Sequence, residues 1–580
     1  MFTHFNGAMV ALQALLFAAS VLGARLVDFQ VAQPPPLPKD AKQCTIRLFE
    51  HTFANSYYVP AIADYTPPTD CGEVGSWVGI SLNFTVTSNG TQYDRLGVFT
   101  FQNVEIWRTS TPEPTSGDGI IWQYLKDVTR FQPLFAEPGL FILELNNIVQ
   151  TGLTGEYAST LEATFYASSA AHPPATTANL IVPISTLSNT SSDEASVPPS
   201  FSLNITIPVN SVAAYAELQA SGNGEEEFWY FNAPNNYLDL LPSGTTYGTG
   251  PFREVRFLVD SLLAGVAFPY PVIFTGGIIP NAWRPITSYG AIDLPTYHFD
   301  LSPFIPLLAD GEPHTITLDV ASAETDHAIN SNWFVSGAVH IILGDSDQPT
   351  TGNITLYKAD DYAVTTESGG QDDTGAVAFS VGATRSIHIE STIVPGNGKE
   401  TKVIFKQDLA YTNKQSYNVD ATIEVVKQIA SGTVTSTHDG TVVLEDTFSY
   451  PLTINLTATD ANFNNYSATF DHSYNRVLLP APFLLGTTIA EHQVSGGRFV
   501  STSSGNIGIN GTSENTFKYT DVKGNTFSQT VNAASNVITL NKESGNLAPS
   551  PLPASTIAAA ATHVPLKMGA RLPGGNVAGH

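Results

Sequence analysis

Residues 80–86 have the sequence ISLNFTV, in which every second side chain is apolar. Successive side chains of a β-strand point to opposite faces of the sheet, so this alternation predicts a strand with one buried face. The pattern recurs at residues 141–145, 161–165, 201–207, 316–320 and 452–456. No long segment has a convincing helical period, and turn residues such as Ser88-Asn89-Gly90 separate the alternating segments. We therefore predict an all-β protein of antiparallel strands.

The composition limits the classes of partner. The chain has 580 residues, with 25 Lys and Arg against 52 Asp and Glu, and a formal net charge of −27. This charge repels nucleic-acid phosphates and anionic lipid surfaces, so we expect no nucleic-acid partner and no stable membrane association. Only 13% of the residues are charged while 42% are apolar, a balance typical of β-rich extracellular domains.

The N-terminal segment predicts export. Residues 1–24 lack Lys and Arg and contain an apolar stretch from Ala8 to Leu22, which indicates a signal peptide with a weak n-region; an uncleaved anchor is the alternative. In a secreted protein Cys44 and Cys71 are expected to form one disulfide. We expect the protein to be secreted, to the exterior or to an acidic lumenal compartment, where fewer carboxylates repel one another. Eight N-glycosylation sequons agree with export and begin at Asn83, Asn89, Asn189, Asn204, Asn353, Asn455, Asn465 and Asn510.

The length and the shifts in composition predict several folded units. The segment Ala167 to Ser200 is poor in large apolar residues, aromatic residues become scarce after Asp347, and the chain after Leu547 is rich in Pro, Ala and Gly. We predict two adjacent jelly-roll-like antiparallel β-sandwiches plus a C-terminal β-rich domain. The expected units are residues 25–170, a linker or exposed excursion at 171–200, residues 201–347, residues 348–545 and a flexible tail at 546–580.

Two segments are unusually rich in Trp, Arg, Asp and Glu for a chain with so little charge, namely residues 93–130 and 225–293. Sugar C–H faces pack on aromatic rings while sugar hydroxyls bond to charged groups, so this mixture indicates a carbohydrate site. The familiar hydrolase motifs GxSxG and HExxH are absent from the sequence. The thirteen histidines have no ligand spacing, so we expect neither a metal nor a cofactor.

These segments closely resemble the A-type peptide N-glycanases, the peptide-N4-(N-acetyl-beta-glucosaminyl)asparagine amidases. The matching strings are Asp94–Val98, Val104–Thr115, Trp122 with Lys126–Thr129, Glu227–Tyr230, Gly250–Val255, Thr275–Ile278, Trp283–Ile286 and Asp293–Pro295. The resemblance implies an amidohydrolase that cleaves the bond between asparagine and the first N-acetylglucosamine of an N-linked glycan. Its products are an aspartate-containing peptide and a glycosylamine.

The resemblance also implies where the chemistry lies. A fainter likeness to the bacterial two-jelly-roll peptide N-glycosidase suggests that Asp94 is the counterpart of its essential aspartate. Amide hydrolysis needs an activated water, a stabilised oxyanion and a protonated leaving nitrogen. We expect Asp94 to be the base or water-orienting group and either Glu227 or Glu254 to be the acid. Arg95 or Arg253 is expected to stabilise the developing charge or to grip the substrate carbonyl.

The remaining expected substrate-binding residues are Trp107, Arg108, Trp229, Trp283 and Arg284. Each candidate has a structural alternative. A carboxylate beside an arginine, such as Glu254 beside Arg253, is nearly as often an ion pair between strands, and Trp in a sandwich is usually a core side chain.

Two other functions remain open. The first is a glycan-binding β-sandwich without turnover, since fold and binding surface do not imply catalysis. The second is a glycoside hydrolase acting on the chitobiose core, which would leave one N-acetylglucosamine on the peptide. The expected partner is an N-glycosylated peptide or glycoprotein, and the expected state is a monomer.

Overall fold

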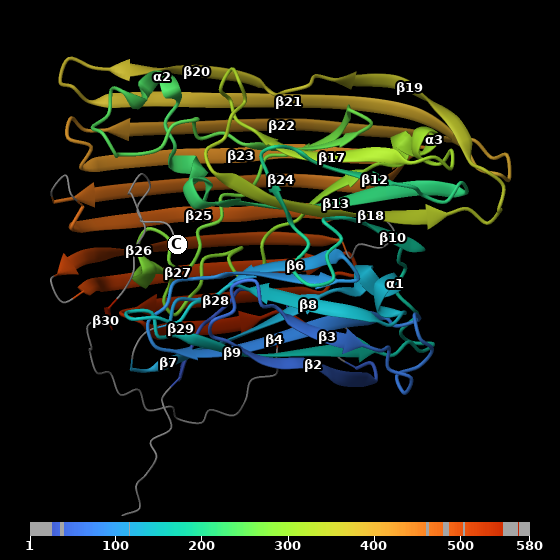
Figure 1. The fold of residues 1–580 in the computed structure, drawn as a ribbon, viewed down its shortest axis with the longest axis horizontal. Helices are drawn as coiled ribbons and strands as arrows, with labels where there is room; N and C mark the ends of the chain where they lie inside the picture. The colour runs from blue at the N-terminus through green and yellow to red at the C-terminus, as the bar shows by residue number, and fades with distance from the viewer. Residues whose placement is uncertain are drawn as a thin grey trace, which may run out of the picture.

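The computed structural model describes residues 26–34, 40–114, 117–459, 463–479, 486–502, 505–548 and 566–567. These residues form five β-sheets, shown in Figure 1. The helices within them are single turns, namely η1 (Thr129–Phe131), α1 (Gln132–Phe135), η2 (Gly224–Glu226), η3 (Trp229–Phe231), α2 (Asn235–Leu238), η4 (Pro280–Trp283), η5 (Ser302–Phe304) and α3 (Ile305–Leu308). The predicted all-β class is confirmed.

The first two sheets form the N-terminal unit, drawn in blue in Figure 1. One has the order β1 (Leu26–Asp28), β7 (Gly119–Asp127), β4 (Gly79–Asn89), β9 (Glu156–Tyr166), β2 (Gln43–Phe53). The other has the order β3 (Ala61–Tyr65), β8 (Gly139–Leu145), β5 (Leu96–Phe101), β6 (Val104–Ser110). The predicted strand at residues 80–86 lies within β4, and Phe84 packs edge-on against Phe99 of β5, with ring centroids 5.1 Å apart. The apolar faces of the two sheets therefore share one core.

The second unit also consists of two sheets. One has the order β10 (Leu180–Ile184), β18 (Asn332–Leu343), β13 (Ser211–Asn223), β16 (Tyr297–Asp300), and β11 (Ala195–Val197) also pairs with β18. The other has the order β12 (Phe201–Ile205), β17 (His314–Ala321), β14 (Glu254–Val259), β15 (Leu262–Ala267). Phe257 of β14 and Phe299 of β16 pack between the two sheets, with ring centroids 6.3 Å apart. The segment expected as a linker or exposed excursion, residues 171–200, thus contributes two strands to this unit.

The remaining strands form one large antiparallel sheet. Its order is β19 (Thr351–Ala359), β21 (Val377–Val394), β22 (Thr401–Tyr417), β23 (Ile423–His438), β24 (Thr441–Ala458), β25 (Asn465–Leu479), β26 (Thr487–Thr502), β27 (Gly505–Asp521), β28 (Thr526–Ala534), β29 (Val537–Ser544). β20 (Val364–Gln371) pairs with β21, and β30 (Leu566–Lys567) pairs with β27. Buried and exposed side chains alternate along β21 and β22, as expected for a sheet with one covered face.

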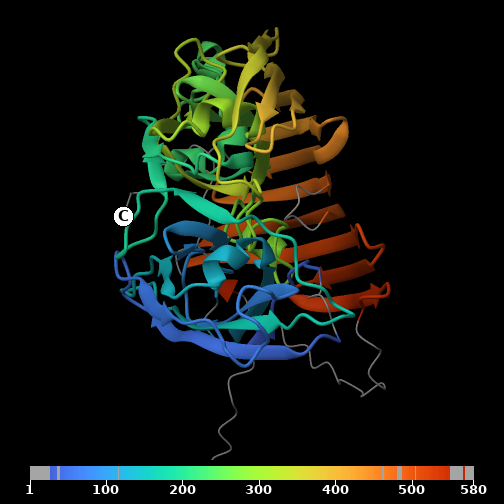
Figure 2. The same ribbon diagram turned by 90° about the vertical axis from the view of Figure 1, so that its right-hand side faces the viewer.

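Figure 2 shows this sheet edge-on, with both sandwiches on one side of it. Its inner face packs against the second sandwich, where the Tyr411 ring lies 5.1 Å from Phe252 and the Phe470 ring lies 4.8 Å from Trp283. Many inner residues of β21 to β26 belong to the same hydrophobic core as the second sandwich. The sheet therefore forms a backing layer that stabilises the second sandwich.

The two sandwiches contact each other through buried charges. Arg130, in η1 after β7, forms a bidentate ion pair with Glu217 of β13, with N–O distances of 2.7 and 2.5 Å. The backbone N–H of Ser110 donates to the carbonyl of Ala291 at 2.8 Å. These contacts bring the end of β6 against the loop between β15 and β16.

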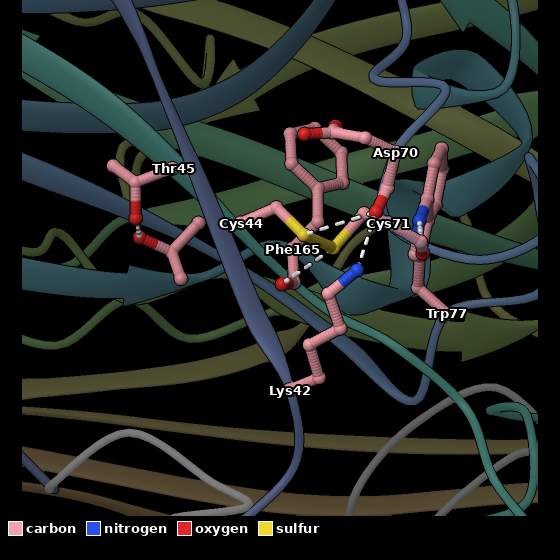
Figure 3. Close-up of a disulfide and its surroundings, with 8 residues drawn as sticks. Lys42, Cys44, Thr45, Asp70, Cys71, Trp77 and Phe165 are labelled. Atoms are coloured by element: carbon pink, nitrogen blue, oxygen red, sulfur yellow. Dashed lines mark hydrogen bonds between the residues drawn. A yellow bond between two sulfur atoms is a disulfide. The ribbon is translucent and has the colours of Figure 1, made fainter.

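The predicted disulfide between Cys44 and Cys71 is confirmed, with a Cα–Cα distance of 5.8 Å. Figure 3 shows that Lys42 and Trp77 lie beside it: Lys42 Nζ donates to the Asp70 carbonyl at 2.6 Å, and Trp77 Nε1 donates to the Cys71 carbonyl at 3.1 Å. The bridge ties the start of edge strand β2 to the loop before β4.

The expected signal peptide, residues 1–24, lies outside the described residues, as does the expected flexible tail except for residues 546–548 and 566–567. The asparagine side chains of all eight sequons are at least partly exposed. Within the described part of the chain, no helix has the length and apolar character needed to span a membrane.

Candidate active site

Asp94 lies in the loop between β4 and β5, with a half-buried side chain. This loop is paired with the segment that follows β6: Arg95 N–H donates to Thr111 Oγ1 at 2.9 Å, and Thr111 N–H donates to the Arg95 carbonyl at 3.0 Å. The Tyr157 hydroxyl donates to the Tyr93 carbonyl at 2.8 Å. These bonds fix the backbone on both sides of Asp94 and place it beside residues 111–114.

Gly276 shows which carboxylate faces Asp94. A Cβ built on Gly276 would lie under 3.0 Å from both Asp94 Oδ1 and Glu113 Oε1. The two oxygens are therefore at most about 6 Å apart, within the range over which one charge changes the ionisation of another. Only a residue without a Cβ leaves room for both carboxylates at this point. Asp94, Glu113 and Gly276 are the central residues of the candidate active site.

Glu113 has a buried side chain, 2% exposed, and its backbone lies between Pro112 and Pro114. Arg284 Nη2 donates to the Glu113 carbonyl at 2.6 Å and lies 3.7 Å from Glu113 Oε2. Sequence reasoning did not select Glu113 as catalytic, although it stands inside the string Val104–Thr115 that carries the resemblance. Its position between two prolines, which restrict the backbone, was the available signal.

Tyr157 lies close enough to Asp94, Glu113 and Arg95 for their charges to affect its pKa. Burial raises the pKa of Tyr157 above its ordinary value, and the charges of Asp94 and Glu113 raise that pKa further while Arg95 lowers it. The Tyr157 hydroxyl therefore stays protonated and lies near all three charged groups. Burial also lowers the pKa of Arg284, while the charge of Glu113 opposes this shift. Because a guanidinium keeps its proton in proteins, Arg284 is a fixed cation beside Glu113.

Arg95 follows Asp94 in the chain. Its Nη2 donates to Gln92 Oε1 at 2.7 Å and its Nη1 donates to the Tyr57 hydroxyl at 3.2 Å. The side chain is half-buried. The expected role of Arg95 toward substrate stays a prediction.

Glu227 belongs to the second sandwich and approaches the segment that carries Gly276. The ring of the next residue, Phe228, lies 3.4 Å from where a Cβ on Gly277 would stand. Burial raises the pKa of Tyr230, and the charge of Glu227 raises it further. The Tyr230 hydroxyl donates to the Val272 carbonyl at 3.3 Å. Glu227 thus lies alongside residues 272–277.

Glu254, the other expected acid, lies in a different environment. Its carboxylate is buried and accepts hydrogen bonds from Arg385 Nη2 of β21 at 2.8 and 2.7 Å, and from the Ala363 N–H at 3.1 Å. This pair joins the second sandwich to the C-terminal sheet. Glu254 therefore forms an ion pair, which is the structural alternative to catalysis given above.

Arg253 and Arg108 are also engaged in buried ion pairs. Arg253 bonds both carboxylate oxygens of Glu226 at 2.6 and 2.7 Å. Arg108 bonds both oxygens of Glu105 at 2.7 Å and donates to Ser221 Oγ across the sandwich junction at 2.9 Å. Both side chains are 0% exposed. Each side chain contributes to the packing of the fold rather than to an accessible surface.

The three tryptophans expected to contact sugar are core side chains. Trp107 is 0% exposed and stacks on Phe99 at 4.5 Å. Trp229 is 3% exposed and packs against Trp333. Trp283 is 0% exposed, and its Nε1 donates to the Gly277 carbonyl at 2.9 Å. Trp283 therefore stabilises the Gly276–Gly277 turn through this bond. Because all three side chains are buried, none of them offers a ring face to a ligand.

A cavity of about 240 Å³ lies elsewhere, where both sandwiches meet the C-terminal sheet. Its walls include Lys126, Asp293 and Tyr124, which bond one another: Asp293 accepts from Lys126 Nζ at 2.6 Å and from the Tyr124 hydroxyl at 2.7 Å. Asp94 and Glu113 are not among its lining residues. The candidate active site is therefore distinct from this cavity.

Two facing carboxylates with arginines on either side can divide proton acceptance and proton donation between them. In the described part of the chain, two β-sandwiches hold both carboxylates against Gly276. This arrangement is typical of the class of hydrolases that use carboxylates.

Comparison with known proteins narrows the class. The family model for peptide N-acetyl-beta-D-glucosaminyl asparaginase amidase A matches residues 34–360, and that for the PNGase_A C-terminal domain matches residues 378–452. The chain belongs to this family, which confirms the resemblance.

A peptide-N4-(N-acetyl-beta-glucosaminyl)asparagine amidase A of Prunus dulcis is 30% identical over 426 residues, which cover 69% of this chain and 71% of that protein. A crystal structure of a peptide-N(4)-(N-acetyl-beta-D-glucosaminyl) asparagine amidase is 14% identical. The similar region covers 53% of this chain and 97% of that chain, with a TM-score of 0.34.

Proposed function

We propose that this amidase hydrolyses the amide between asparagine and the proximal N-acetylglucosamine of N-glycosylated peptides or glycoproteins, and that Asp94 and Glu113 are its reacting carboxylates. The observation that carries the proposal is the convergence of Asp94 Oδ1 and Glu113 Oε1 at Gly276. Family membership supplies the substrate class. In this proposal Glu113 takes the role expected from the sequence for Glu227 or Glu254, and Glu254 is bound to Arg385.

The geometry supports an acid–base mechanism. One carboxylate of the pair, when ionised, takes a proton from a water whose oxygen attacks the amide carbon. The other, when protonated, gives its proton to the nitrogen as the C–N bond of the tetrahedral intermediate breaks. The products are aspartate in the peptide and a glycosylamine. Arg284 Nη2, 3.7 Å from Glu113 Oε2, supplies a fixed positive charge beside the pair.

Arg95 is the group we assign to the substrate carbonyl. Arg95 follows Asp94 in the chain, its side chain is half-buried, and the contacts described above join its guanidinium to the uncharged partners Gln92 and Tyr57. A cation in such a position can stabilise the oxyanion that forms on the carbonyl. Arg253, the expected alternative, is bound to Glu226.

Incubation with a defined glycopeptide, followed by mass spectrometry, tests the proposal. Hydrolysis raises the mass of the freed peptide by about one unit relative to asparagine, because amide becomes acid. Asp94→Asn and Glu113→Gln should each abolish this product, whereas the control Glu50→Gln, an exposed carboxylate on β2, should leave it unchanged. Intact glycopeptide with the wild-type protein, or a peptide that retains one N-acetylglucosamine, would contradict the proposal.

We further propose that the protein is a secreted monomer of an extracellular or acidic lumenal compartment. The disulfide supports an oxidising environment. Expression in a secretory host should release the protein into the medium with a new N-terminus near residue 25. Retention inside the cell with residues 1–24 intact would contradict export, and sedimentation at twice the monomer mass would contradict the monomer.

A further inference from the structure

Tyr57 and Tyr58 differ from the other aromatic residues of this protein. Among the described Phe, Tyr and Trp side chains, Tyr58 is 83% exposed and Tyr57 is 37% exposed, while the others are more deeply buried. Val59, the next residue, is 58% exposed. Three consecutive exposed apolar side chains on a fold that covers its aromatic residues mark a surface kept open for contact. We call residues 57–59 the tyrosine tip.

The tyrosine tip is held in place rather than left loose. It lies between β2 and β3, after Ser56, whose side chain is buried and donates to the Leu145 carbonyl at 2.7 Å. The Tyr58 N–H donates to Asn146 Oδ1 at 2.9 Å, and Tyr58 has a φ of 57°, a left-handed conformation that is unfavourable for a bulky residue. The neighbouring loop therefore holds Tyr58 in an exposed orientation at a cost in backbone energy.

The tyrosine tip borders the candidate active site. The Tyr57 hydroxyl accepts a hydrogen bond from Arg95 Nη1 at 3.2 Å, and the guanidinium carbon lies 6.0 Å from the Tyr57 ring centroid. Arg95 directly follows Asp94 in the chain. The tyrosine tip is therefore joined through Tyr57 to Arg95, the residue next to Asp94 in the chain.

We infer that the tyrosine tip is a binding surface for a pyranose ring of the substrate glycan, with Tyr58 as the stacking residue and Tyr57 as the link to Arg95. This inference rests on the proposed function. The C–H face of a neutral sugar packs on an exposed aromatic ring and needs no charged partner. The tryptophans expected to do this are buried, so the tyrosine tip is the aromatic surface that the described structure offers beside the carboxylate pair. A peptide bound in extended form would instead be recognised through backbone hydrogen bonds at a sheet edge.

Kinetics of Tyr58→Ala test the inference with two inhibitors, free N,N′-diacetylchitobiose and the deglycosylated peptide. We expect Tyr58→Ala to raise KM for the glycopeptide about five- to tenfold, as lost ring stacking predicts, with kcat nearly unchanged. The inhibition constant of chitobiose should rise by the same factor, while that of the peptide should not change. Tyr58→Phe should retain wild-type values because it keeps the ring.

Val364→Ala, which shortens a 63% exposed side chain on β20 of the C-terminal sheet, is the matched control and should behave as wild type. Two results for Tyr58→Ala would overturn the inference. One is an unchanged KM with unchanged inhibition by chitobiose, and the other is weaker inhibition by the deglycosylated peptide alone. Calorimetric titration of chitobiose into Asp94→Asn, with and without Tyr58→Ala, needs no turnover. Failure of the proposed function, seen as no hydrolysis by wild type, is therefore distinguishable from failure of the sugar surface.

Discussion

Asp94 and Glu113 direct carboxylate oxygens at one point on Gly276, although they come from different loops of the first sandwich and Gly276 comes from the second. The second sandwich thus contacts the carboxylate pair through the backbone of Gly276 and not through a side chain. Thr275, the residue before Gly276, donates its hydroxyl to the Thr111 carbonyl at 2.7 Å, which fixes this approach. The catalytic geometry therefore depends on the contact between the two sandwiches.

Gly276→Ala should lower kcat by about a hundredfold or more, because the methyl group would displace both carboxylates and small displacements of reacting groups have effects of this size. Steady-state kinetics on a glycopeptide provide the measurement. Gly440→Ala is the control: it strains a positive φ of 78° in the turn between β23 and β24, where a Cβ meets nothing within 4 Å. It should cost stability but not activity per folded molecule, and equal losses in both variants would argue against the Gly276 assignment.

Glu254→Gln should destabilise the protein without removing catalysis. The substitution leaves the Arg385 guanidinium buried beside a neutral amide, and breaking such a buried pair costs about 3–5 kcal/mol. Chemical denaturation measures the free energy of unfolding, and activity is then compared per folded molecule with that of Glu113→Gln. If Glu254→Gln is stable but inactive, Glu254 regains the catalytic role expected from the sequence.

The protein should be more stable in acid than at neutral pH over part of the range. Burial raises the pKa of Glu424 to about 8, that of Glu194 to about 7 with help from the charge of Glu105, and that of Asp193 to about 6. Raised carboxyl pKa values contribute stability that is fully present below the unfolded values near 4 and is lost as pH rises through 6 to 8. Burial lowers the pKa values of His298 and His472 to about 3 and about 4, so these histidines oppose the carboxyl groups below the ordinary histidine value of 6.5. The melting temperature should therefore fall mainly between pH 6.5 and pH 8.

Glu424→Gln tests the cause of this pH dependence, because an amide keeps the buried position uncharged at every pH. The variant should show a smaller fall in melting temperature between pH 6.5 and pH 8 than wild type. Glu217 and Glu226 act in the opposite direction below pH 4, since arginine partners hold their pKa values below the ordinary value despite burial. An identical pH dependence in wild type and Glu424→Gln would show that Glu424 does not ionise in this range.

Removal of the disulfide by the double substitution Cys44→Ser and Cys71→Ser should lower the free energy of unfolding by about 3.5 kcal/mol, the loop-closure value for a separation of 27 residues. Denaturant titration measures this difference. Below the melting temperature the turnover should not change, because Cys44 lies at the start of β2 while the tyrosine tip follows its other end. A loss of turnover in the folded variant would mean that the bridge also positions the site.

Local sequence determined the strands, the class and the family. Alternating side chains predict strands wherever they occur because the two-residue period is a property of the backbone itself, and the segments at residues 80–86, 141–145 and 452–456 lie within β4, β8 and β24. The disulfide followed from having two cysteines in a chain for which export is expected. The family was predicted from long, distinctive strings, and the family model that matches residues 34–360 confirms this prediction.

Tertiary structure alone decided which carboxylate faces Asp94 and which aromatic rings reach solvent. Glu113, Glu227 and Glu254 each stand in a string that carries the resemblance, and the flanking prolines of Glu113 do not by themselves make it the partner of Asp94. Contacts with Arg284 and Arg385 put Glu113 at the candidate site and Glu254 at the junction with the C-terminal sheet. The tryptophans in the matching strings are buried, whereas Tyr57 and Tyr58 are exposed. Burial and charge pairing depend on residues far away in the chain, so no local pattern encodes them.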